Sequence, residues 1–263
     1  MREKIPCTVG ILTYNNENTI KRALESVKDF EEIIICDGGS TDKTLMIADS
    51  YGARVLKQDD IYKDETGKLF DYSGPRNQML EAATLEWFAF LDSDEEFTIE
   101  LVDEIYNVIK SNSDISVYRL HRKFVYEKEV VTCSVGYPNF QVRLFRKDAV
   151  KNFIKPIHER IDYNSEQKVG DLKSNLLVPL EMSAIELQEK WRHYLKIQIS
   201  CSSKSRFRRV YVSLFNIIKY SLVYSVRLVS CRLFVRGKKL PLSLEWVWFW
   251  QHYESLRINL LSK

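Results

Sequence analysis

A cluster of carboxylates directly follows an apolar run near the middle of the chain. Residues 87–91 read WFAFL, and the next five residues, DSDEE, supply four acidic side chains. Carboxylates this close repel one another unless a positive charge lies among them, and a hard divalent cation is a common solution. Alternate residues of an extended segment point the same way, so Asp92 and Asp94 can face one ligand. The alternative is a solvated loop in which Glu95 and Glu96 favour the N-terminus of the next helix.

A second acid ends another apolar run. Asp37 follows IIIC and precedes two glycines, which let a ligand approach the backbone closely. Such a position, at the end of a strand, is one where a nucleotide can be bound. In the simpler interpretation the glycines only form a turn, Ser40 caps the following helix and Asp42 lies at its start. The motif alone leaves both interpretations open.

The elements that must position these acids alternate between strand and helix up to about residue 110. Apolar runs predict strands at residues 7–14, 33–36, 53–58 and 86–92. Helical spacing predicts helices at residues 16–27, 40–51, from Pro75 onward, and from a Thr98 cap to Ile109. This order favours an α/β fold whose parallel strands are covered by helices and bind ligands at their carboxyl ends. Asp37 and Asp92 are therefore expected at one edge of the sheet.

The pattern changes after residue 115. Residues 116–126 and 139–146 are rich in β-branched and aromatic side chains and predict antiparallel or edge strands, and residues 155–163 predict a loop and short strand. After residue 185 the chain has 15 Lys and Arg against 4 Asp and Glu, whereas the preceding part has 24 against 32. This shift predicts a catalytic domain at residues 1–185 and a basic, helical extension at residues 186–263.

Several motifs follow one another in a specific order: TYNNENTIKRALESV, IIICDGGSTDKT, GPRNQML, FAFLDSDEEF, QVRLFR and IHERI. Together they resemble glycosyltransferase family two, the inverting sugar-nucleotide transferases, and in particular its lipopolysaccharide-core branch. The resemblance implies a GT-A fold: a Rossmann-type mixed, mainly parallel sheet flanked by helices. It also implies a nucleotide-diphosphate sugar donor, a glycan or glycolipid acceptor, and a divalent cation, Mn²⁺ or Mg²⁺.

The same resemblance assigns roles to individual residues. Asp94 would be the metal ligand, with His158 as an additional metal or phosphate contact. Glu159 would remove the proton of the acceptor hydroxyl, and Asp162 is the reserve choice for that base. The donor nucleotide would be contacted by Thr13, Tyr14, Asn15, Glu17, Asp37, Arg76 and Asp92, with Arg76 over the base or diphosphate and Asp92 at the ribose. For Glu17 the alternative is a residue that only begins the helix, and for Arg76 a surface residue of a first helical turn. Arg143 and Arg146 are left open between phosphate contacts and pairing with acids.

The basic extension contains a long amphipathic stretch. At residues 206–239, Phe215, Ile218, Leu222 and Val226 recur at helical spacing while basic side chains interrupt the apolar run. Its charge-free pieces are short against the roughly 20 apolar residues that a bilayer span needs, so a span is disfavoured. A helix lying on an anionic membrane fits better, and a helix packed on the catalytic domain is the alternative. The stretch is too apolar for a nucleic-acid-binding arm.

The cysteines and the N-terminus indicate the compartment. The five cysteines are scattered and include no CxxC pair, which argues against a disulfide framework or a structural zinc site. The first apolar stretch is too short for a signal peptide. We therefore expect an enzyme at the cytoplasmic face of the inner membrane. A sugar nucleotidyltransferase and a non-catalytic, membrane-associated nucleotide-binding protein are the alternatives.

Overall fold

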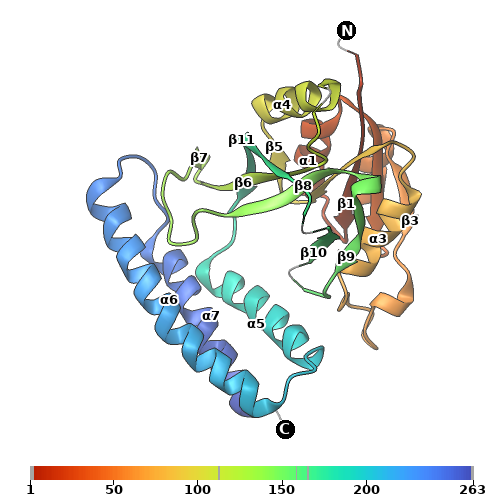
Figure 1. Cartoon of the computed structure of the whole chain (residues 1–263). Coiled ribbons are helices and arrows are strands. Elements are labelled where there is room, and N and C mark those ends of the chain that lie inside the picture. Colours follow the sequence, from red (N-terminus) through yellow and green to blue (C-terminus); the bar gives the residue numbers. More distant parts are fainter. Residues whose placement is uncertain (1–2, 112, 158, 165, 262–263) are drawn as a thin grey trace. The chain divides into compact units, whose positions relative to one another are not determined.

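The computed structural model describes residues 3–111, 113–157, 159–164 and 166–261 (Figure 1). The chain forms two compact units: residues 1–122 with 140–178, and residues 123–139 with 179–263. The second unit thus combines residues 123–139 with residues 179–263, whereas the sequence placed residues 123–139 and 179–185 in the first domain. Each unit is described by itself.

The first unit alternates strands and helices over its first 110 residues and then adds further strands. Its elements are β1 (Ile5–Thr13), α1 (Ile20–Val27), β2 (Phe30–Asp37), α2 (Thr44–Ser50), β3 (Arg54–Lys57), η1 (Asp60–Tyr62), α3 (Ser73–Ala82), β4 (Trp87–Asp92), β5 (Glu96–Phe97), α4 (Ile99–Lys110), β6 (Val117–Tyr126), β8 (Phe140–Arg146), η2 (Lys147–Ala149), β9 (Val150–Ile154), β10 (Arg160–Tyr163) and β11 (Val169–Pro179). The last residues of β6 and the last residue of β11 pass into the second unit.

The main sheet has the strand order β3-β2-β1-β4-β8-β6-β11-β5. Strands β3, β2, β1 and β4 are parallel, and β8 pairs antiparallel with both β4 and β6. This mixed α/β architecture confirms the predicted fold class. The short strand expected within residues 155–163 is β10. Two elements were not foreseen: the long strand β11, and β9, which pairs with β10 in a separate small sheet.

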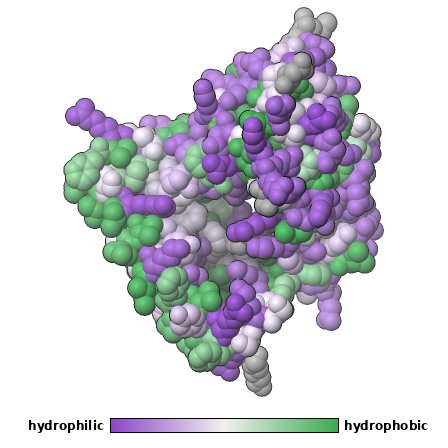
Figure 2. Space-filling model, viewed as in Figure 1, coloured by the Kyte–Doolittle hydropathy of each residue, from purple (hydrophilic) through white to green (hydrophobic). Residues whose placement is uncertain are grey.

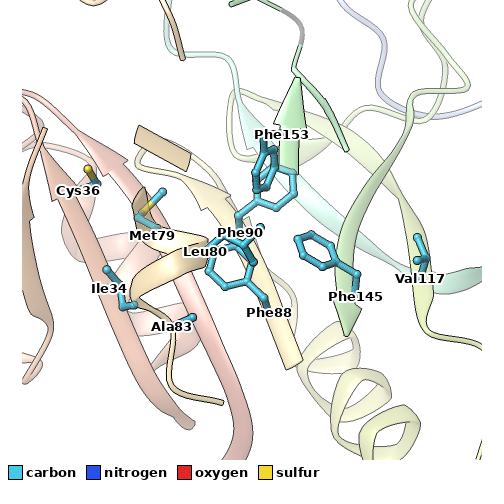
Figure 3. Close-up of a cluster of buried hydrophobic side chains, with 10 residues drawn as sticks. All are labelled: Ile34, Cys36, Met79, Leu80, Ala83, Phe88, Phe90, Val117, Phe145 and Phe153. Atoms are coloured by element: carbon cyan, nitrogen blue, oxygen red, sulfur yellow. The ribbon is translucent and has the colours of Figure 1, made fainter. Parts of the chain in front are cut away.

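An aromatic cluster holds the central strands and α3 together (Figure 3). Phe88 and Phe90 of β4 contact Phe145 of β8 and Phe153 of β9, with ring centroids 5.6 Å and 5.1 Å apart respectively. Met79 of α3 is fully buried in the same cluster. Dense packing restricts the movement of neighbouring backbone, so the end of β4 is a rigid place from which to present Asp92.

Two caps were predicted at helix starts, with different outcomes. The Thr98 hydroxyl accepts a hydrogen bond from the Leu101 N–H at 3.2 Å, which confirms Thr98 as the cap of α4. The prediction for Ser40 is wrong, because α2 begins only at Thr44 and has no side-chain cap. The Ser40 hydroxyl instead donates to Asp37 at 2.5 Å, which keeps the intervening turn out of the helix.

The second unit is mainly helical, which confirms the helical C-terminal part. It contains β7 (Glu129–Val130), α5 (Ala184–Ser200), α6 (Arg206–Phe234) and α7 (Leu242–Leu261), with α7 packed against both other helices. A capping box of Ser183 and Glu186 starts α5.

A covalent bond ties residues 123–139 to the helices of the second unit. Cys133 and Cys231 form a disulfide with Cα atoms 5.6 Å apart. The buried carboxylate of Glu245 adds to this link by accepting hydrogen bonds from the Ser134 hydroxyl and the Val135 N–H, each at 3.1 Å. The expectation of a chain without disulfides is therefore wrong. No local spacing pattern identifies this pair, because its members are 98 residues apart.

Candidate functional site

The carboxyl ends of three parallel strands meet at one edge of the sheet. In the strand register, Thr13 of β1 lies beside Asp37 of β2, and Leu12 of β1 lies beside Asp92 of β4. Asp37 and Asp92 thus flank the end of β1, as the alternation of strands and helices led us to expect. Ligands of open α/β sheets bind at this edge.

The loops that follow β1 and β2 are tied together by reciprocal hydrogen bonds. The Asn15 N–H donates to the Ser40 hydroxyl, and the Asn15 side-chain oxygen accepts from the Thr41 N–H, each at 2.8 Å. The Glu17 N–H donates to Asp42, and a Glu17 carboxylate oxygen accepts from the Lys43 N–H, each at 3.0 Å. Asn15 and Glu17, which the sequence assigned to the donor nucleotide, therefore shape the loops of this edge.

Asp37 is almost fully buried and organises the turn after β2. One of its oxygens accepts from the Thr13 and Ser40 hydroxyls at 2.9 and 2.5 Å, and the other from the Gly39 and Ser40 N–H groups at 2.7 and 2.8 Å. Gly39 has a φ of 101°, a conformation that favours glycine. Tyr14, by contrast, is 60% exposed and presents an aromatic ring at this edge.

Arg76 brings the two candidate catalytic regions together. It lies in the first half of α3, and its Nη2 donates to Asp92 at 2.6 Å while its Nε donates to Glu159 at 2.9 Å. Asp92 ends β4, and Glu159 immediately precedes β10. The Arg76 side chain is only 6% exposed. Planar guanidinium groups are suited to holding two carboxylates in fixed positions, so Arg76 sets the geometry between Asp92 and Glu159.

Glu95 extends this ion-pair network on the other side of Asp92. Its side chain is completely buried and pairs with Arg122 of β6 and with Arg143 of β8, the latter at 3.2 Å. Arg143 also reaches the second oxygen of Asp92 at 3.3 Å, and the Asp92 N–H donates to Glu95 at 3.1 Å. Asp92 is therefore held by its backbone and by both side-chain oxygens.

The pKa values in the network follow from burial and the arginines. Burial opposes ionisation of Asp92, but Arg143 and Arg76 outweigh it and hold the pKa of Asp92 well below its usual range. At Glu95 burial dominates and raises the pKa in spite of Arg122 and Arg143. Asp92 is therefore the more firmly ionised of the two carboxylates.

Within the ion-pair network, two buried guanidinium nitrogens have no hydrogen-bond partner among the described residues. They are Nη1 of Arg76 and Nε of Arg122. The guanidinium carbon of Arg76 also lies 4.7 Å from the centroid of the Phe90 ring, and that of Arg143 lies 4.4 Å from it. A buried donor without a partner is costly. Arg76 can still donate one hydrogen bond through Nη1, and an anionic or polar ligand that accepts it would remove this cost.

The carboxylates of this edge fit a divalent cation that takes few ligands from the protein and further ligands from substrate phosphates. Asp94 offers a hard carboxylate ligand two residues after Asp92, whose own oxygens are engaged by Arg76 and Arg143. Within the described parts of the chain, no group of three His, Cys, Asp or Glu side chains is placed to share a metal ion. Mg²⁺ and similar cations are commonly bound by one or two carboxylates, with water and substrate phosphates completing the shell. Asp94 is the residue of this edge that would contribute such a ligand.

The other residues that the sequence singled out do not all belong to the ion-pair network. Asp162, the reserve base, lies on β10 opposite Asn152 of β9. Arg143 belongs to the ion-pair network, whereas Arg146 pairs with Glu86 and with Asp148, the latter at 3.0 Å. His158 lies outside the described residues.

Two members of the network had no role in the sequence-based site: Glu95 and Arg122. Glu95 directly follows the DSD motif, but its sequence position also fits an acid at the start of the next helix. That interpretation assigned Glu95 no part in the site. Arg122 lies in a strand with several basic residues and is 27 positions from Glu95. The only available signal was the alternation of side chains between the two faces of β6. This alternation does not show which basic residue of the strand pairs with a buried acid.

A family model and several known proteins match this chain. A family model described as Glycosyl transferase family 2 matches residues 8–165. A TPR repeat-containing protein of Synechococcus elongatus is 34% identical over 144 residues, which cover 54% of this chain and 32% of that protein. The SPbeta prophage-derived glycosyltransferase SunS of Bacillus subtilis is 38% identical over 104 residues, covering 39% of this chain and 23% of SunS. The matched regions thus span less than a third of either relative.

A solved structure shares the fold. It is glucosyl-3-phosphoglycerate synthase from Mycobacterium tuberculosis in complex with phosphoglyceric acid. The TM-score is 0.50 at 17% sequence identity, and the match covers 74% of this chain and 78% of that chain. At this identity the likeness concerns the fold alone, and it agrees with the mixed α/β architecture described above.

Proposed function

The chain belongs to glycosyltransferase family 2, and from this we propose that it is an inverting hexosyl- or related glycosyltransferase that uses a nucleotide-diphosphate sugar. We propose a hydroxyl of a surface glycan, of lipopolysaccharide-core or capsule type, as the acceptor. The observation that carries the proposal is the Arg76 bridge between Asp92 and Glu159. It links a strand-end acid, suited to binding the donor, to an acid suited to accepting a proton.

On the donor side, the chain's own residues bind and orient the nucleotide. Tyr14 supplies an exposed ring for the base, and Asp92 accepts hydrogen bonds from the ribose. Nη1 of Arg76, which has no partner among the described residues, donates to the diphosphate. Asp94 would hold a divalent cation, which when bound stabilises negative charge on the leaving diphosphate. Positioning and charge stabilisation of this kind are the main demands of a displacement at an activated sugar.

On the acceptor side, Glu159 is the proposed base. The acceptor oxygen attacks the anomeric carbon on the face opposite the diphosphate, the bond from that carbon to the diphosphate oxygen breaks, and its electron pair leaves with the diphosphate. The acceptor proton passes to the Glu159 carboxylate. Because Oε1 of Glu159 accepts from Arg76 at 2.9 Å, Oε2 is the oxygen proposed to take the proton.

We also propose that the second unit contacts an anionic membrane, at the cytoplasmic face of the inner membrane. The residues that α6 buries are Ser213, Tyr224 and Cys231. Most of its large exposed apolar side chains recur on one face: Phe207, Tyr211, Leu214, Phe215, Ile218, Leu222, Val226, Val229 and Leu233. This arrangement is the reverse of that on a helix that packs its apolar face into a core. Figure 2 shows the hydrophobic residues along the side where Figure 1 draws α6.

The charges and length of α6 support the same proposal. The helix has six Lys and Arg and no Asp or Glu. Among the described residues it is the one helix long and apolar enough to cross a membrane, with a mean hydropathy of 1.3 in its most apolar window, of which 11% is buried. Its other face packs on α7, which buries Gln251, Glu254 and Asn259. One-sided packing favours a helix that lies in the interface with its apolar stripe in the lipid.

Calorimetric titration with UDP, GDP, CDP and dTDP, with and without Mn²⁺, tests the donor site. We expect metal-dependent affinity for one nucleotide that Asp94→Asn reduces and Glu100→Gln leaves unchanged. Glu100 is a matched control because it is an exposed carboxylate in the first turn of α4. Release of free nucleotide from the corresponding nucleotide sugar, increased by a glycan acceptor, would then demonstrate transfer. Nucleotide binding without any turnover would favour a non-catalytic binding protein, and absence of binding would refute the donor site.

A further inference from the structure

The second unit contains an open groove with a volume of about 530 Å³. It lies among the first turns of α5, the first turns of α7, and Leu228 of α6. Its lining residues are Ala184, Ile185, Gln188, Leu228, Leu242, Ser243, Glu245, Trp246 and Phe249. The volume is within the range of small-molecule sites, which are mostly apolar with a few polar groups.

The polar groups of the groove do not indicate a polar ligand. Glu245 is only 2% exposed, and its carboxylate already accepts hydrogen bonds from Ser134 and Val135. The remaining lining is mainly aliphatic and aromatic. An occupant would therefore be recognised by hydrocarbon contact.

Large apolar side chains of this lining remain open to solvent. Ile185, Leu242 and Trp246 are 69%, 62% and 59% exposed. Exposed apolar groups gathered around a concavity mark interaction sites more often than scattered ones do. Tryptophan is also typical of positions at a membrane–water boundary.

The helix that contributes Leu228 indicates the occupant. The same α6 carries the exposed apolar stripe and its six cations without a single acid. Basic side chains near an apolar surface attract anionic lipids. An anionic lipid can contact both features at once. Its headgroup can pair with the cations of α6 while one of its hydrocarbon chains leaves the bilayer and enters the groove.

We propose that this groove binds one acyl chain of an anionic membrane lipid while α6 lies on the bilayer. The inference rests on the proposed membrane contact and is independent of the donor site. A bound chain covers the exposed side chains of α5 and α7, and it anchors the helical unit more firmly than the stripe of α6 alone.

Photocrosslinking with the full chain tests the groove. The probe is phosphatidylglycerol with a photoreactive group in its acyl chain, placed in vesicles of phosphatidylcholine with or without unlabelled phosphatidylglycerol. We expect mass spectrometry to find the label on residues 184–188 and 242–249. Ser243→Trp fills the groove and should reduce this labelling roughly tenfold, because a rigid aromatic side chain replaces the space for the chain.

Ser203→Trp is the matched control, since Ser203 is exposed in the loop between α5 and α6 and does not line the groove. It should label as the wild type does. Labelling confined to α6, or groove labelling that survives Ser243→Trp, would refute the proposal. So would a dimer in vesicle-free solution that protects the groove from hydrogen exchange, because a second copy would then be the occupant. Nucleotide titration on the same samples separates a failed groove from a failed donor site.

Discussion

Replacing Arg76 by methionine should destabilise the first unit. The size of the loss measures how much the ion-pair network contributes to the free energy of unfolding. Methionine keeps most of the side-chain length but leaves Asp92 and Glu159 without their shared cation. Removing one member of a buried ion pair costs about 3–5 kcal/mol. We expect about 2–4 kcal/mol here, because the Asp92 side chain is 33% exposed and Arg143 remains 3.3 Å from it. At about 2–4 °C per kcal/mol, the melting temperature should fall by roughly 4–16 °C.

The control for this change is Arg146→Met. Arg146 also pairs with two acids, Glu86 and Asp148, but its side chain is 37% exposed and both acids are more than half exposed. Solvent-exposed pairs contribute about 0–1 kcal/mol. Scanning calorimetry of both variants at pH 7 should therefore show a large loss at position 76 and a small one at position 146. Equal losses would refute the argument that burial of the network gives Arg76 its importance.

The pH dependence of the loss distinguishes charge from packing. The pKa of Asp92 is depressed in the folded state because Arg143 and Arg76 outweigh burial. Such an acid contributes stability that is fully present above its unfolded-state pKa, near 4, and is lost as the pH falls through the folded value. The gap between wild type and Arg76→Met should thus be full at pH 7 and narrow below about pH 4. A gap of the same size at pH 3 would mean that the variant lost packing against Phe90 instead.

Three further changes have defined outcomes. Glu159→Gln should lower the transfer rate about 10²–10⁴-fold while donor affinity by calorimetry is kept, whereas Asp162→Asn should reduce the rate far less; the reverse order would make Asp162 the base. Reduction of the Cys133–Cys231 disulfide, which closes a segment of 98 residues, should lower the unfolding free energy of the second unit by about 4 kcal/mol, measured by urea titration with and without a reductant. Burial lowers the pKa of His252 from 6.5 to about 4, so the second unit should lose stability as the pH falls from about 6.5 to 4; His252→Phe should flatten that part of the melting-temperature profile.

Local sequence patterns predicted the parallel half of the sheet well. The apolar runs that end in Asp37 and Asp92 are buried on both faces, and a strand of that kind has a continuous hydrophobic signature. β11 was missed because Asp171 and Lys173 alternate with its buried residues and Ser174 interrupts the buried face, so the segment lacks a strong apolar run. Ser40 was misassigned because a serine after a glycine turn fits both a cap and a turn, and only the contact with Asp37 decides between them.

Local sequence patterns could not predict the ion-pair network, because its members are far apart in the chain. Arg76 and Glu159 are 83 residues apart, and Arg143 and Glu95 are 48 apart. Nothing local distinguishes these residues from the many exposed Lys, Arg, Asp and Glu of the chain. A sequence pattern shows that a charge exists, whereas its burial depends on the strand order that brings β8 between β4 and β6.

The balance of charges in the network supports a metal-dependent donor site. Three arginines, Arg76, Arg122 and Arg143, face three carboxylates, Asp92, Glu95 and Glu159. Because the positive charges of these three arginines are balanced by three carboxylates, Asp94 adds a net negative charge to the edge that would receive a diphosphate. Two like charges brought together there repel unless a cation separates them. A divalent ion held by Asp94 would offset these negative charges, so Asp94→Asn should reduce the Mn²⁺-dependent affinity and leave the metal-free affinity equal or higher.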